Sequence, residues 1–151
     1  MLGMGRTLYA KSGKNVERVL LLGALGATVC YLTAALSGIA VIGLIACAFT
    51  GFCVSMLWPG SLIAAYDRFP DGSVFIYAMM AAGGDLGASV GPQLIGIITD
   101  TVAANTSLAG VAAALSLSPE QFGMKIGMLI AAVFPLCAIF VYRRLQKNKK
   151  K

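Results

Sequence analysis

The chain has 151 residues, of which 58% are hydrophobic and only 12% are charged, and its mean hydropathy is +0.83. This composition excludes an ordinary water-soluble domain and is typical of an integral membrane protein. The net charge of +6 does not indicate nucleic-acid binding, because the basic residues lie beside apolar segments and are not interleaved with aromatic residues. We therefore expect the lipid bilayer as a partner and no nucleic acid.

The first part of the chain contains a basic loop and two predicted spans. Residues 1–18 carry four basic residues and one acid, which predicts a solvated loop at a membrane surface. No charge occurs between Arg18 and Asp67, a stretch of 48 residues, whereas one crossing needs about 20. Helices are expected there, because lipid offers the backbone no hydrogen bonds and no period-2 alternation indicates barrel strands. We place them at about 19–36 and 39–66.

The second part of the chain supplies two further predicted spans. A turn after Asp67 leads into a third span at about 74–98, within which Asp85 is the only charged residue. The outer loop 99–121 contains an apolar run of about 10 residues, too short to cross, so we expect an interfacial or re-entrant piece there.

The loop ends in a helix-start signal, in which Ser118 is the predicted N-cap, Pro119 the first helical residue and Gln121 the partner in a capping box. The fourth span follows at about 122–142, and residues 143–151 form a basic tail.

The charges also predict the topology. Four spans place the first loop, the turn after the second span and the tail on one side of the membrane. That side then holds all but Lys125 of the 12 lysines and arginines, which indicates the cytoplasm by the positive-inside rule. We expect a multi-pass protein of the plasma membrane with both termini in the cytoplasm.

The third span contains the stretch 81–96, AAGGDLGASVGPQLIG. At 100° per residue Asp85, Ser89 and Gln93 share one face, and Asp85 lies about 18 Å from the start of the span. A carboxylate at this depth costs about 3 kcal/mol unless it meets a cation, a cavity or a proton. These three residues are therefore candidates for a substrate path. In the alternative, Asp85 bonds to a neighbouring helix and never touches substrate.

Other positions suggest helix packing or a further path residue. Gly83, Gly87 and Gly91 fall on roughly the opposite face and predict close packing against another helix. Pro92 follows them and removes one backbone donor. Trp58 lies about 12 Å from the end of the second span, deeper than interfacial tryptophans usually lie, so it is another path candidate. The alternative for Trp58 is a side chain packed between helices or facing lipid.

The sequence contains no arrangement that indicates catalysis or metal binding. It has no histidine, and its four cysteines lie inside apolar runs without a CxxC pair, so we interpret them as packing residues. No nucleophile is clustered with a base, and no phosphate-binding loop stands between a strand and a helix. We expect no enzymatic activity, no metal and no cofactor.

Several of these features together resemble the C-terminal end of a major facilitator superfamily transporter. They are the basic cytoplasmic loop with Arg6, Lys11, Gly13 and Lys14, the Trp58-Pro59 pair, the Asp67-Arg68-Phe69-Pro70 turn, the stretch 83–96 and the final span with its basic tail. Ala10 stands where the loop motif of that family usually has an acid. The resemblance covers nearly the whole chain and implies that its spans correspond to helices nine to twelve of a twelve-helix fold.

The resemblance also implies a function. It implies secondary transport of a small solute by alternating access, with the solute held near the midplane between two six-helix halves. Four helices do not enclose such a cavity, so we expect a truncated or split C-terminal piece that works with the missing transporter helices. Two alternatives stay open: a complete four-helix protein that transports as a homo-oligomer, and a membrane scaffold that does not transport.

Overall fold

The computed structural model describes residues 3, 7 and 15–149, without the side chains of Ser73, Thr106, Asn148 and Lys149. The described part is α-helical apart from short turns and one 3-10 helix, and it contains no strand. Four of its segments are long and apolar enough to cross a membrane: Val16–Leu36, Ala40–Arg68, Val74–Ala104 and Pro119–Lys147. The chain is therefore an all-α, multi-pass membrane protein, as its composition predicts.

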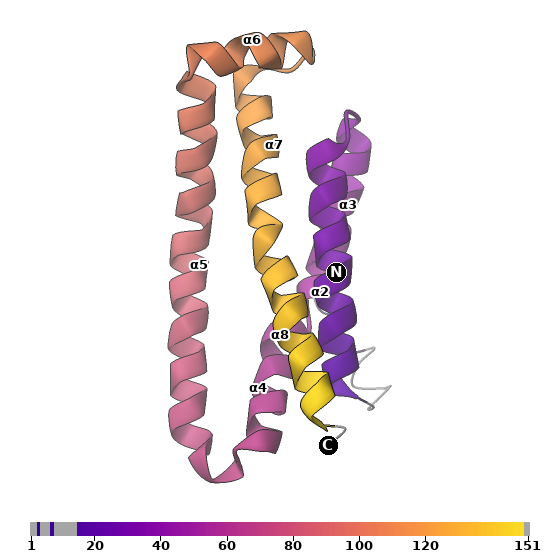
Figure 1. Ribbon diagram of the computed structural model, residues 1–151, viewed down its shortest axis with the longest axis vertical. Helices are drawn as coiled ribbons and strands as arrows, with labels where there is room; N and C mark the ends of the chain where they lie inside the picture. The colour runs from indigo at the N-terminus through magenta and orange to yellow at the C-terminus, as the bar shows by residue number, and fades with distance from the viewer. Residues whose placement is uncertain (1–2, 4–6, 8–14, 150–151) are drawn as a thin grey trace.

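The spans are built from six of the helices that Figure 1 shows. In chain order the elements are α2 (Val16–Leu36), α3 (Ala40–Val54), α4 (Leu57–Arg68), the 3-10 helix η1 (Pro70–Gly72), α5 (Ser73–Ala104), α6 (Thr106–Ala114), α7 (Pro119–Ala131) and α8 (Val133–Lys149). The second span consists of α3 and α4, and the fourth of α7 and α8. The short α6 lies across the ends of α5 and α7 (Figure 1).

Prolines accompany the interruptions in the second and fourth spans. The second span is interrupted at Ser55 and Met56, just before Pro59, and the fourth at Ala132, just before Pro135. Each proline lacks the N–H that would bond to the carbonyl four residues earlier, and its ring crowds that carbonyl. The third span contains Pro92, yet α5 runs through it without a break.

The packed centre of the molecule is α2, which contacts α3, α4, α7 and α8. A Cβ atom at Gly23 would lie 2.6 Å from the backbone carbonyl oxygen of Cys53 in α3, so the two backbones touch there. Small residues of this kind let transmembrane helices approach closely, which is the main source of their attraction in lipid. The buried residues of α2 are Leu20, Ala24, Ala27, Thr28 and Ala35. All of them except Leu20 are small.

The third span stands to one side of this centre (Figure 1). α5 contacts α4, α6, α7 and η1, and among the described residues it makes no contact with α2, α3 or α8. None of its described side chains is buried. Its closest contact is with α7, where a Cβ atom at Gly123 would lie 2.5 Å from the carbonyl oxygen of Thr99.

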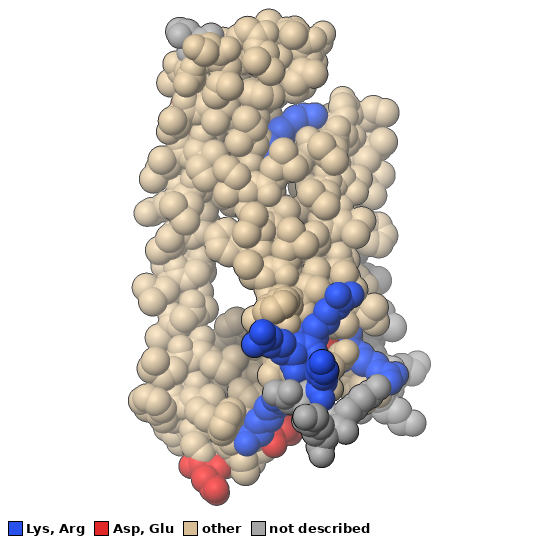
Figure 2. All heavy atoms as spheres, viewed as in Figure 1, with Lys and Arg blue, Asp and Glu red and all other residues tan. Residues whose placement is uncertain are grey.

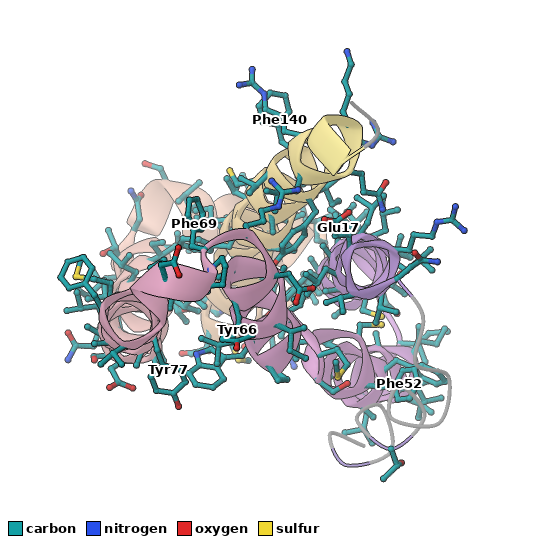
Figure 3. All side chains as sticks on the ribbon, turned by 90° about the horizontal axis from the view of Figure 1, so that it is seen from below. Glu17, Phe52, Tyr66, Phe69, Tyr77 and Phe140 are labelled. Atoms are coloured by element: carbon teal, nitrogen blue, oxygen red, sulfur yellow. The ribbon has the colours of Figure 1, made fainter. Side chains whose placement is uncertain are left out.

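The two ends of the bundle differ in charge, as Figure 2 shows by the lysines and arginines gathered where α8 ends. At this end Arg68 of α4 donates hydrogen bonds to the Glu17 carboxylate of α2 at 3.2 Å and to the Leu145 carbonyl of α8 at 2.7 Å. Figure 3 views the molecule from this end and labels Glu17. At the other end the Lys125 ammonium donates to the Ser37 carbonyl at 2.6 Å. The ends of α2, α4 and α8 that the charge pattern assigns to one side thus lie together.

Candidate functional site

A cavity of about 430 Å³ lies between the helices, where α5 stands away from α2 and α8. All four spans contribute to its lining, which includes Tyr31 of α2, Leu57 of α4, Ile95 of α5 and Phe134 of α8. Its volume falls in the range of small-molecule sites, which commonly lie between helices in bundles. Among the described residues that line it, none is charged, and the phenol of Tyr31 is the one polar side chain.

The local sequence explains why space remains there. Pro92 and Pro135 both line the cavity, and Leu57 lies directly after the interruption in the second span. A proline ring is too short to fill a gap between helices as a long side chain does. The interruptions also change the direction of α4 relative to α3, and of α8 relative to α7 (Figure 1). Much of the remaining lining is small, including Ala27 and Gly91. The cavity is thus a product of the prolines and small residues that several spans supply.

No family model, no curated protein and no solved structure matches this chain.

The predicted path residues of α5 do not line this cavity. Asp85, Ser89 and Gln93 are all exposed, and they form the polar stripe of α5. The Ser89 hydroxyl donates to the backbone carbonyl of Asp85 at 2.5 Å, so it is bonded to its own helix and not to the carboxylate. Among the described residues, nothing gives the side chains of Asp85 or Gln93 a hydrogen bond or an ion pair. The structure brings the three together on one face, as their spacing predicts.

The predicted packing face of α5 meets no neighbour among the described helices. A Cβ atom at Gly83, Gly87 or Gly91 would meet nothing within 4 Å. The helix packs against α7 through a face about a quarter of a turn away, which carries Ile95 and Thr99. Close packing of the glycine face against a further helix therefore stays a prediction. Of the predicted packing residues, Gly91 and Pro92 line the cavity.

Trp58 packs against α5 at Gly84, a neighbour of the predicted ladder. A Cβ atom at Gly84 would lie 2.7 Å from the indole Nε1 of Trp58, so only a glycine leaves room for the ring. The side chain is 47% exposed and is not part of the cavity lining. This placement agrees with the alternative interpretation, in which the tryptophan packs between helices.

The pair of glycines at which α7 packs closely against α5 is not among the predicted positions. Gly123 and Gly127 of α7 are buried, and a Cβ atom at Gly127 would lie 3.0 Å from Cγ2 of Ile95. Ala131 continues the same buried face at the same spacing. The signal was present as G-x-x-x-G at 123–127, the pattern that marks close helix pairs in membranes.

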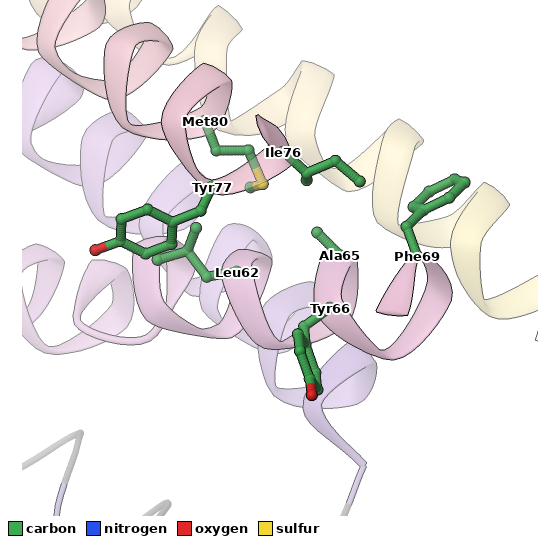
Figure 4. A pocket seen from close by; sticks show the side chains of 7 residues that line it. All are labelled: Leu62, Ala65, Tyr66, Phe69, Ile76, Tyr77 and Met80. Atoms are coloured by element: carbon green, nitrogen blue, oxygen red, sulfur yellow. The ribbon is translucent and has the colours of Figure 1, made fainter. Parts of the chain in front are cut away.

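A second cavity of only about 50 Å³ lies between α4 and the start of α5, and Figure 4 shows the side chains around it. It is too small for a solute larger than a few atoms. Its lining is almost wholly apolar and consists of Leu62, Ala65, Tyr66, Phe69, Ile76, Tyr77 and Met80. We interpret it as the imperfectly filled contact that joins α4 to α5 near the basic end.

The remaining predicted positions belong to the basic loop. Arg6, Lys11, Gly13 and Lys14 lie outside the described residues. The neighbouring basic end is held together by Arg68, and also by Ser61 of α4 and the Tyr142 hydroxyl of α8, whose oxygens are 3.1 Å apart. These contacts tie α4 to the first and last spans, whereas the described side chains of α5 make no hydrogen bond or ion pair to another span.

Proposed function

We propose that this chain is part of a secondary membrane transporter and contributes four helices to the path of a small solute. The observation that carries the proposal is the polar stripe of α5. Asp85, Ser89 and Gln93 are exposed on a helix whose other exposed side chains are mostly apolar. A carboxylate inside a bilayer is stabilised by a partner group or by water, and such residues commonly mark solute or proton paths. The stripe therefore faces further helices across a polar path.

The surroundings of α5 support this proposal. The helix has a cavity on one side and the polar stripe on another, and its backbone approaches α7 closely at Ile95 and Thr99. The interrupted spans on the far side of the cavity are of the kind that transporters use around their binding sites. The resemblance to the C-terminal helices of the major facilitator superfamily points to the same function, with alternating access as its mechanism.

The same proposal fixes an orientation and partners. The basic end, with Arg68 and the end of α8, faces the cytoplasm, and the protein resides in the plasma membrane. The partners are the solute and further transporter helices that cover the polar stripe. A second copy of the chain is the competing partner, favoured by the exposed Gly83 and Gly87, because small residues allow a helix to approach.

The proposal is tested by comparing two acids on α5. Membrane vesicles from cells that produce the chain are incubated in a mixed extract of small cellular solutes, and the retained solutes are compared with vesicles that lack it. We expect uptake or depletion of at least one solute, lost in Asp85→Asn and kept in the matched control Asp100→Asn, which changes an exposed acid near the end of the helix. Equal behaviour of both variants and of the unmodified chain would contradict the proposal.

A further inference from the structure

We propose that the cavity of about 430 Å³ between the helices is a binding site for a neutral, largely apolar molecule. This inference rests on the proposed function and names the class of solute, but its test does not depend on transport. The ligand chemistry is that of an uncharged aryl or alkyl group with at most one hydrogen-bond acceptor. Such a group has two sources, a free solute and the acyl chain of a membrane lipid.

The lining decides the charge of the ligand. No charged side chain contributes to it, and the polar stripe of α5 with Asp85 is not part of it. A carboxylate or ammonium group in this cavity would lose its hydration without gaining a partner, which is strongly unfavourable. Charged solutes are therefore excluded as ligands of this cavity.

One polar group determines where a ligand acceptor would lie. The Tyr31 hydroxyl makes no hydrogen bond to the described residues, although Tyr31 lines the cavity. Tyr31 is partly exposed, and a carbonyl or ether oxygen of a ligand would give its phenol a hydrogen-bond partner inside the cavity. Water is a poor occupant, because it needs two to four polar partners and the lining offers one such side chain.

The shape of the molecule provides a route to the cavity. Figure 2 shows openings in the surface between α5 and the rest of the bundle. Because α5 makes no contact with α2 or α8 among the described residues, this side of the cavity is not closed by helix packing. An apolar molecule dissolved in the bilayer can therefore enter laterally, without passing through the charged end.

The test uses a neutral photoreactive probe, a trifluoromethyl phenyl diazirine, on the full chain in lipid-free micelles. We expect saturable labelling of Tyr31 and Leu57, which line the cavity and are only partly exposed, displaced by excess biphenyl and not by biphenyl carboxylate. Leu44 and Phe49 of α3, which are 72% and 54% exposed, should be labelled without saturation. Non-saturable labelling at Tyr31 and Leu57, or equal displacement by the carboxylate, would overturn the inference.

Three variants make the result specific to the cavity. Ala138→Phe fills it from α8, and saturable labelling should disappear, whereas Ala103→Phe at a half-buried alanine of α5 outside the lining should retain it. Tyr31→Phe preserves the volume and should leave displacement by biphenyl unchanged, while weakening displacement by benzophenone about five-fold, as the loss of one hydrogen bond predicts. Unchanged benzophenone affinity would contradict the role of the Tyr31 hydroxyl.

A further arm separates the two sources of the ligand. If added phosphatidylcholine abolishes the saturable labelling, a lipid acyl chain is the natural occupant; if labelling persists, a free apolar solute is. Both outcomes support the ligand class. A saturable site without solute flux would contradict only the proposed transport function, and flux without a saturable site would contradict only this inference.

Discussion

The first and third spans are both apolar helices with several glycines, yet the bundle uses them in opposite ways. In α2, Gly23 and Gly26 meet Cys53 of α3 so closely that a Cβ atom at either would lie 2.6 Å from it. In α5, Gly83 and Gly87 meet nothing within 4 Å. Glycine spacing thus identifies a face that can approach another helix, but only a complementary neighbour turns that face into a contact.

The largest effect is expected where α5 does touch a neighbour. Gly123→Leu places a side chain against the Thr99 carbonyl, which is backbone and cannot move without displacing α5. We expect a loss of about 3 kcal/mol in the free energy of unfolding, measured by denaturation in micelles. The control Gly87→Leu enters open space and should not lower stability, since leucine favours the helix by about 1 kcal/mol over glycine. Equal losses in both variants would contradict the contrast between the two glycine faces.

The next effect concerns Arg68, whose hydrogen bonds join α4 to α2 and α8. Arg68→Ala removes the bonds to Glu17 and to the Leu145 carbonyl, and we expect a loss of about 2 kcal/mol in the same measurement. The exposed Arg143 offers a control, because Arg143→Ala removes a charge of the same end without a described hydrogen bond. A loss as large for Arg143→Ala would show that net charge, and not the tie between spans, stabilises this end.

A smaller effect would sharpen the account of α4 and α5. Gly84→Ala places a methyl group 2.7 Å from the indole of Trp58, and we expect a loss of about 1 kcal/mol. Without the indole of Trp58, the methyl group of Gly84→Ala has nothing to clash with. The double variant Gly84→Ala/Trp58→Ala should therefore be no less stable than Trp58→Ala alone. Additive losses in this double-mutant cycle would mean that the two residues do not touch.

The smallest effect is expected at the other end. The Lys125 ammonium donates to the Ser37 carbonyl, which lies just after the C-terminus of α2, where a cation is favoured by the helix dipole. Lys125→Met should cost about 0.5 kcal/mol at low salt and less at high salt. A loss that does not depend on salt would contradict the electrostatic part of this explanation.

The features that local sequence controls could be predicted. The long apolar stretches predict the four spans. The capping box at Ser118 is also confirmed: the Gln121 N–H donates to the Ser118 hydroxyl, and the Ser118 N–H donates to the side-chain oxygen of Gln121. The apolar run in the outer loop forms α6, which lies over the ends of α5 and α7 (Figure 1) and is too short to span a membrane. Each of these outcomes depends on residues that are neighbours in the chain.

The features that depend on neighbours in space could not be predicted. Pro59 and Pro135 lie at interruptions while Pro92 does not, although all three remove the same backbone donor. The glycines of α5 were the more conspicuous ladder, but Gly123 and Gly127 meet the surface that fits them. The cavity has no sequence signature, because four spans supply two to four residues each and almost all of these are apolar.

The central claim, that the polar stripe of α5 faces a water-filled path, is tested most directly by thiol accessibility. Ser89→Cys and the adjacent Val90→Cys are each introduced into a chain whose four cysteines are replaced by alanine, and intact membranes receive a membrane-impermeant maleimide. Both positions are exposed, but only Ser89 lies on the stripe. We predict that Ser89→Cys reacts many times faster than Val90→Cys. Equally slow reaction at the two positions would contradict the account.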